Sequence, residues 1–210
     1  MLTKTLKWTD RVYDKELAFE LPIAIHKLES PNILIVYPGA NGSIDGYEDK
    51  YIKLANLTIK NKASAVVRSP NPYMLSQGWD YNLRKLIEYV IKNSIEISGT
   101  KTPNIHILGV SIGAGAVASI AWEYPQVNKI ILVAPADTNI LDQVQDGLNR
   151  FDEEVRIFVG ENDEACGVKG AKRFYKGCVN SKPKSLKIIP NCDHHFSGKV
   201  NQEIFVRLGM

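Results

Sequence analysis

The stretch of sequence that decides the fold is Ile105-His106-Ile107-Leu108-Gly109-Val110-Ser111-Ile112-Gly113-Ala114-Gly115-Ala116-Val117-Ala118. Its first four residues form a mostly apolar run typical of a buried strand, and its last five are small residues that suit a helix. The G-x-S-x-G pattern between them predicts a strand, a sharp turn and a helix. A serine at the tip of such a turn has strained backbone angles, and glycine two positions before and after it avoids side-chain collisions.

Ser111 would stand at the tip of this turn, with its hydroxyl above the edge of the sheet. The N-terminus of the following helix and the backbone N–H of Ile112 favour negative charge there, as an oxyanion-stabilising site requires. Taken alone, the pattern also fits a glycine-rich turn without any chemistry. The rest of the chain must therefore distinguish a nucleophile elbow from a plain turn.

Length and composition are those of one globular domain. The chain has 210 residues, 44% of them hydrophobic, and a formal net charge of +3, which predicts a single domain over residues 1–210. No block of basic residues is interleaved with aromatics, so we expect no nucleic-acid partner. No apolar run approaches the roughly 18 residues that span a bilayer, so we expect no membrane span.

The N-terminal sequence and the cysteines indicate the cellular compartment of the protein. Residues 1–8 contain no apolar segment of the kind found in secretory signals. Cys166, Cys178 and Cys192 are odd in number and lack the spacing of a disulfide scaffold. The sequence therefore predicts a cytoplasmic protein with reduced thiols.

Apolar runs alternate with helical patterns along the chain. Strands are expected at residues 16–28, 32–37, 63–68, 104–109, 129–134, 155–159 and 186–190, and helices at 47–61, 77–97, from the elbow to 124, and at 139–150, 168–178 and 197–208. Strands separated by helix-length connections predict an α/β fold: a mostly parallel sheet of about seven or eight strands with helices on both faces. We find no repeat and no linker.

Two later loops carry the groups that a serine nucleophile needs. A serine hydroxyl is a poor nucleophile without a neighbouring base, and the base needs an orienting acid. Asp163 follows the strand expected at 155–159, and His194 follows the strand expected at 186–190. Because strand ends at one edge of a parallel sheet bring distant positions together, Ser111, Asp163 and His194 are candidates for one catalytic site.

With these motifs the chain resembles the α/β-hydrolase superfamily, whose triad runs Ser, then Asp or Glu, then His. The G-x-x-D sequence at 160–163 is similar to the turn that carries the family acid, and Asp-His-His-Phe at 193–196 is similar to the segment that carries the family histidine. The resemblance covers about residues 20–208. It implies the α/β-hydrolase fold and a triad made of the three candidates above.

Other residues in these loops compete for two of the roles. Glu161 and Asp137 are alternative acids, the latter after the strand expected at 129–134, and His195 is an alternative base. The run at 192–195 combines Cys, Asp and His but lacks the partner spacing of a metal site, so we expect neither a metal nor another cofactor.

Residues 37–42, Tyr-Pro-Gly-Ala-Asn-Gly, resemble the H-G-x-x-G loop of the same superfamily, with Pro38 where histidine often stands. The resemblance implies that the backbone N–H of Ala40 is a second oxyanion donor beside that of Ile112. A side chain at position 38 is not a donor in this role, so the departure at Pro38 leaves it intact.

The resemblance implies a small, capless serine hydrolase that cleaves a carboxylic ester or thioester through an acyl-serine intermediate. About twenty residues separate the strands expected at 129–134 and 155–159, which is too few for a large cap. We expect Tyr73, Met74 and Trp79 to form a pocket wall for an apolar acyl chain, although core packing would explain them equally well.

Two other functions are compatible with the same residues. One is a non-catalytic ligand-binding protein on the hydrolase fold, and the other is an acyltransferase that passes the acyl group to an alcohol or amine. The expected partner in each case is a small-molecule acyl compound. No motif indicates the identity of the acyl and leaving groups, the pathway or the oligomeric state.

Overall fold

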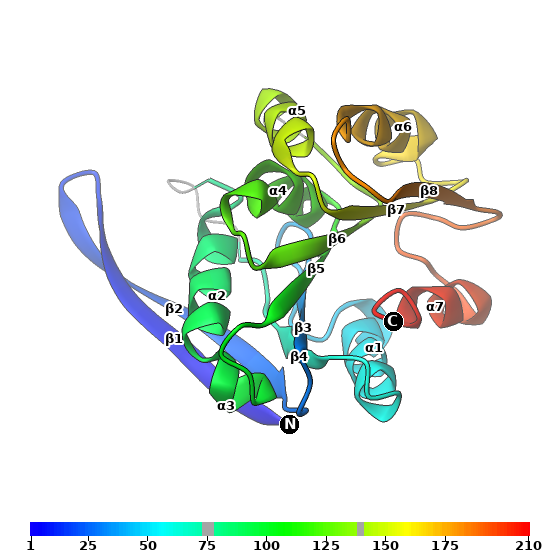
Figure 1. Ribbon diagram of the computed structural model, residues 1–210. Coiled ribbons are helices and arrows are strands. Elements are labelled where there is room, and N and C mark those ends of the chain that lie inside the picture. Colours follow the sequence, from blue (N-terminus) through cyan, green and yellow to red (C-terminus); the bar gives the residue numbers. More distant parts are fainter. Residues whose placement is uncertain (73–77, 138–140) are drawn as a thin grey trace.

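The computed structural model describes residues 1–72, 78–137 and 141–210 and contains an eight-stranded sheet (Figure 1). Its strands are β1 (Leu2–Val12), β2 (Lys15–His26), β3 (Asn32–Tyr37), β4 (Ala65–Arg68), β5 (Asn104–Val110), β6 (Val127–Val133), β7 (Glu154–Gly160) and β8 (Lys184–Ile189). Across the sheet the order is β1-β2-β4-β3-β5-β6-β7-β8. The strands from β3 to β8 are parallel, whereas β1 and β2 run antiparallel to their neighbours.

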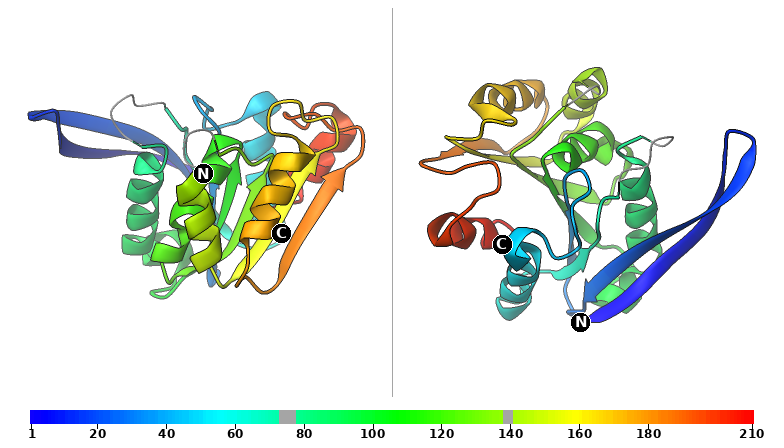
Figure 2. Two further views of the ribbon diagram at one scale, coloured as in Figure 1. Left: turned by 90° about the horizontal axis from the view of Figure 1, so that it is seen from above. Right: turned by 180° about the vertical axis from the view of Figure 1, so that it is seen from behind.

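Helices cover both faces of the sheet. They are α1 (Lys50–Lys60), α2 (Tyr81–Lys92), α3 (Ser94–Ser98), α4 (Ile112–Ile120), α5 (Leu141–Arg150), α6 (Gly167–Gly177) and α7 (Lys199–Val206), with short 3-10 turns at Tyr47–Asp49 and Ala121–Glu123. Helices α1 and α7 lie together on one face, and α2 to α6 cover the other (Figures 1 and 2). The apolar core divides in the same way into two clusters, one on each face.

Strands β1 and β2 form a hairpin that extends beyond the rest of the sheet (Figures 1 and 2). All of β1 pairs with β2, but only Ala24, Ile25 and His26 of β2 pair with β4. The sequence patterns did not indicate β1, because only Leu6 and Val12 are buried along it. An edge strand with so few buried residues has no continuous apolar run to mark it.

The helix expected at residues 77–97 is two helices. α2 ends at Lys92 and α3 begins at Ser94, with Asn93 between them at φ −109° and ψ 17°. The side-chain amide of Asn93 donates to the carbonyl of Tyr89 (2.8 Å). Such local bonds from Asn compete with the regular hydrogen bonds of a continuing helix.

The predicted α/β sheet, mostly parallel and with helices on both faces, is confirmed. Between β6 and β7 the described residues hold a single helix, α5, so no large cap is inserted in that part of the chain. In the described ranges no helix is long and apolar enough to cross a membrane. The parallel strands place the loops after β5, β7 and β8 at one edge of the sheet, where the candidate site lies.

Candidate active site

Ser111 lies at the sharp turn between β5 and α4. Its φ is 55° and its ψ is −126°, a strained conformation for a residue with a side chain. The N–H of Ser111 donates to the carbonyl of Val133 on β6 (2.9 Å), and its own carbonyl accepts from the N–H of Ala136 (3.1 Å). Ile112 follows as the buried first residue of α4. The predicted sequence of strand, turn and helix is therefore confirmed.

Close packing requires the two glycines of the G-x-S-x-G pattern. A Cβ at Gly109 would lie 2.7 Å from the Cα of Ala114, and a Cβ at Gly113 would lie 2.1 Å from the carbonyl oxygen of Pro38. Both distances are well below van der Waals contact, so a side chain at either position would displace backbone. Helix α4 thus packs directly against the loop that follows β3.

Asp163 and His194 meet beyond the ends of β7 and β8. Nδ1 of His194 lies 3.0 Å from Oδ2 of Asp163 and 3.1 Å from its Oδ1. The carboxylate also accepts from the backbone N–H groups of Ala165 (3.0 Å) and Cys166 (2.9 Å). The Asp163 side chain is fully buried, at 0% exposure, and that of His194 is 19% exposed. A carboxylate at Nδ1 favours the tautomer with its proton on Nδ1, which leaves Nε2 as an acceptor.

The contact between these two side chains shifts both of their pKa values. Burial raises the pKa of Asp163, but hydrogen bonds from His194 and from the N–H of Cys166 outweigh burial and lower that pKa below its usual value. The hydrogen bond to Asp163, helped by one with the Cys166 side chain, raises the pKa of His194 to about 9, against partial burial. The imidazole is therefore a stronger base than an isolated histidine.

The alternative acids have other partners. Asp137 pairs with Arg173 (3.0 Å), and Glu161 accepts from a backbone N–H just after β8 (3.1 Å). Of the three candidate acids, Asp163 is the one that the structure bonds to His194.

Ser111 and His194 line the same pocket, which has a volume of about 290 Å³. Ala40, from the loop after β3, lines it as well. The alternative base His195 also borders this pocket, but it is exposed and its ring packs against Tyr47, with 5.6 Å between the ring centroids. The structure thus brings Ser111, His194 and Ala40 to one cavity, and the buried carboxylate is bonded to Nδ1 of the imidazole.

Asn71, which sequence analysis did not single out, holds the loop after β3. It is buried, with 2% exposure. Its side-chain amide donates to the carbonyl of Pro38 (3.1 Å) and accepts from the hydroxyl of Tyr37 (2.8 Å), and its backbone N–H donates to the carbonyl of Gly42 (3.0 Å). These bonds hold the loop on both sides of Ala40, at residues 37–38 and at residue 42. No local pattern indicates them, since Pro38 and Asn71 are 33 positions apart in the chain.

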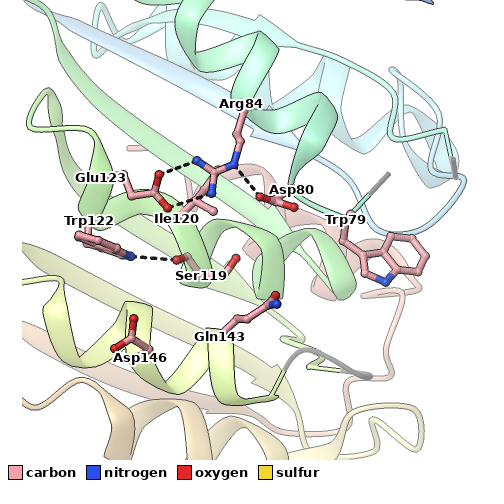
Figure 3. Close-up of a pocket in the computed structure, with 10 residues that line it drawn as sticks. Trp79, Asp80, Arg84, Ser119, Ile120, Trp122, Glu123, Gln143 and Asp146 are labelled. Atoms are coloured by element: carbon pink, nitrogen blue, oxygen red, sulfur yellow. Dashed lines mark hydrogen bonds and ion pairs between the residues drawn. The ribbon is translucent and has the colours of Figure 1, made fainter. Parts of the chain in front are cut away.

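Two of the three residues expected to form a pocket wall, Tyr73 and Met74, lie outside the described residues. Trp79 lines a different pocket of about 380 Å³, between the start of α2, the end of α4 and α5 (Figure 3). Charged side chains in that pocket are bound to one another. Contrary to expectation, Trp79 is not among the described residues that line the pocket of Ser111, because its side chain packs against the apolar core on the face that α2 to α6 cover.

A thiol lies beside the His–Asp pair. One oxygen of Asp163, Sγ of Cys166 and one nitrogen of His194 lie within 4.8 Å of one another. Carboxylate, thiolate and imidazole are all ligands that zinc accepts. The sequence shows no metal motif here because Cys166 is distant along the chain from the segment at 192–195. These three side chains could together hold a cation, and two of them, the carboxylate and the imidazole, are bonded to each other.

The sequence matches no protein-family profile and no curated protein. Solved structures are similar over nearly the full chain. The mouse alpha/beta hydrolase domain-containing protein 10 has a TM-score of 0.73 and 14% identity, covering 98% of this chain and 96% of its own. Est1E from Butyrivibrio proteoclasticus has a TM-score of 0.72 and 14% identity, with 97% and 96% covered. The esterase domain of a Rhodothermus marinus protein has a TM-score of 0.68 and 14% identity, with 99% and 96% covered.

Structural similarity at such low sequence identity shows the fold but not the function, because proteins of one fold have many different activities. The order of the eight strands, the parallel run from β3 to β8 and the elbow at Ser111 agree with these structural likenesses. The chain therefore has the α/β-hydrolase fold.

Proposed function

We propose that this protein is a serine hydrolase that cleaves a carboxylic ester or thioester through an acyl-serine intermediate. One observation carries the proposal. The imidazole of His194, bonded at Nδ1 to the buried carboxylate of Asp163, lines the same pocket as Ser111. One of the structurally similar proteins, from Rhodothermus marinus, is named as an esterase domain, which supports the same class of reaction.

The proposed reaction begins when the Ser111 hydroxyl attacks the acyl carbonyl carbon. His194 accepts the hydroxyl proton, and Asp163 orients the ring and stabilises its positive form. The backbone N–H groups of Ala40 and Ile112 stabilise the oxyanion. The bond to the leaving group then breaks, and His194 gives that group its proton. Water, activated by His194, attacks the acyl-serine and releases the acid.

Turnover of small esters tests the proposal. The purified protein is mixed with para-nitrophenyl acetate, para-nitrophenyl butyrate and a matched thioester, and product release is followed from the first turnover. We expect turnover that depends on Ser111, with a burst of nitrophenol if deacylation is slow. A well-folded protein that turns over none of them would support a non-catalytic binder. Formation of a new ester when glycerol is added would support an acyltransferase.

The pH dependence of the reaction follows from His194, which must be neutral to accept a proton. Because its pKa is raised from 6.5 to about 9, we expect kcat/KM for a neutral ester to rise with pH, to reach half of its maximum near pH 9 and to level off above that pH. The stability of the fold changes with pH in the opposite direction. The Asp163–His194 contact contributes fully to the free energy of unfolding below pH 6.5, and this contribution is lost as the pH rises through 9. Initial rates across this range, with Ser111→Ala as the blank, measure the profile. A rate that is already independent of pH at neutrality would contradict this assignment.

Asn71→Ala is expected to lower kcat by about tenfold or more, with a smaller change in KM. The substitution removes the side-chain bonds that position the loop carrying Ala40, so the N–H of Ala40 is less well placed for the oxyanion. Steady-state kinetics on one neutral ester measure the effect. Asn61→Ala, at an exposed position where α1 ends, is the control. An unchanged kcat in Asn71→Ala would show that the loop keeps its position without Asn71.

A further inference from the structure

The pocket of Ser111 has basic groups on its wall and no carboxylate. Its ionisable lining includes Lys50, His194 and His195, and in the described part of the chain no Asp or Glu lines it. The N-terminus of α1, a helix of 11 residues, borders the pocket through Lys50 and Tyr51. Helix N-termini carry a partial positive charge. The pocket is therefore electrostatically suited to an anion.

Lys50 is the unusual member of this wall, because only 3% of its surface is exposed. Its ammonium donates to the carbonyl of His195 (3.1 Å) and lies 4.7 Å from the ring centroid of Phe205. Within the described ranges no carboxylate lies at ion-pair distance from it. An ammonium has three N–H donors, and burying it without a counter-ion costs free energy. The protein tolerates that cost in the wall of the pocket that Ser111 also lines.

The carboxylate of Asp193 acts on Lys50 but is not a dedicated partner of it. Burial lowers the pKa of Lys50 to about 8, while the nearby Asp193 and Cys192 act to raise it. Asp193 accepts instead from the backbone N–H of Ser197 (2.8 Å). An anion bound in the pocket would supply the counter-charge that Lys50 lacks.

We infer that the substrate carries a carboxylate near its scissile acyl bond and that Lys50 binds this carboxylate, which makes Lys50 a specificity-determining residue. The inference rests on the proposed function, since it concerns the same pocket. A volume of about 290 Å³ limits the bound group to a short chain or a single ring. A charge-assisted hydrogen bond is stronger in such a buried setting than in water, so a neutral ester of equal size loses a large contribution.

Two matched ester pairs test the inference and show which side of the scissile bond carries the charge. For the acyl side, the para-nitrophenyl monoester of adipic acid is compared with para-nitrophenyl hexanoate. For the alcohol side, para-acetoxybenzoate is compared with its methyl ester. We expect a higher kcat/KM for the anionic member of one pair. Lys50→Met is expected to lower the anionic-to-neutral ratio of that pair by about 10- to 100-fold.

Lys53→Met is the matched control, because it removes the same charge from an exposed position on the same helix that does not line the pocket. Its anionic-to-neutral ratio is expected to equal that of the parent. Lys50→Arg keeps the charge and is expected to retain more of the preference than Lys50→Met. If Lys50→Met shows no cooperative unfolding in a thermal melt, Lys50→Arg is the variant whose anionic-to-neutral ratio is compared with that of the parent.

The rates on the four esters distinguish failure of the inference from failure of the proposed function. A parent protein that hydrolyses the neutral esters through Ser111 but prefers neither anionic partner overturns the inference and leaves the proposed function intact. A preference that survives unchanged in a folded Lys50→Met variant overturns it too. Hydrolysis of none of the four esters contradicts the proposed function, and the inference with it.

Discussion

Ser111→Ala is expected to lower kcat for ester hydrolysis by about 10⁴-fold or more, because no acyl-enzyme can form without the hydroxyl. Any remaining rate would come from the oxyanion donors acting on a bound water. The measurement is the steady-state rate on the ester that the parent turns over fastest, with the enzyme concentration raised for the variant.

Ser119→Ala provides the control for this loss. Ser119 lies on the same helix α4, and its hydroxyl donates to the carbonyl of Ala116 (2.8 Å). It does not line the pocket of Ser111, so kcat should stay close to that of the parent. Thermal melts of both variants separate lost chemistry from lost folding. A folded Ser111→Ala variant with most of the parent activity would mean that another group is the nucleophile.

Asp163→Asn is expected to lower kcat by about 10⁴-fold. An amide can present its NH₂ group to Nδ1 of His194, which favours the tautomer with a proton on Nε2 and leaves no acceptor for the serine proton. The same change removes the carboxylate whose hydrogen bond and charge raise the pKa of His194, so the remaining activity should level off at lower pH. Both effects are read from kcat/KM measured as a function of pH.

Asp137→Asn is the matched control for Asp163→Asn, since sequence analysis left Asp137 as an alternative acid. Asp137 forms an ion pair with Arg173, and its removal should change the rate only slightly. The reverse pattern, with activity lost in Asp137→Asn and kept in Asp163→Asn, would assign the acid to the end of β6.

The parts of the fold that sequence patterns predict are those encoded by neighbouring residues. The turn at Ser111 is an example, because the strand before it, the helix after it and the glycines at 109 and 113 all lie within fourteen consecutive residues. Continuous apolar runs likewise mark the buried parallel strands. Edge strand β1 was missed because it buries so little, and the break at Asn93 was missed because one side-chain bond decides it.

The residues of the candidate site also differ in whether the local sequence indicates them. The sequence predicted that Asp163 and His194 would lie near each other, since both follow strands that end at one edge of a parallel sheet. The structure pairs these two strands, β7 and β8, and bonds the two side chains together. Their chemical roles stay predictions. Asn71 and Lys50 were not found, because their importance comes from contacts with the loop after β3 and with the pocket wall, which no local spacing encodes.

The most direct test of the proposed activity is the intact mass of the protein after incubation with a fluorophosphonate, which reacts with an activated serine. We expect one adduct per chain, located by peptide mapping at Ser111, absent in Ser111→Ala and formed much more slowly in His194→Ala. A folded protein that forms no adduct, or forms it at another residue, would contradict the claim that Ser111 is an activated nucleophile.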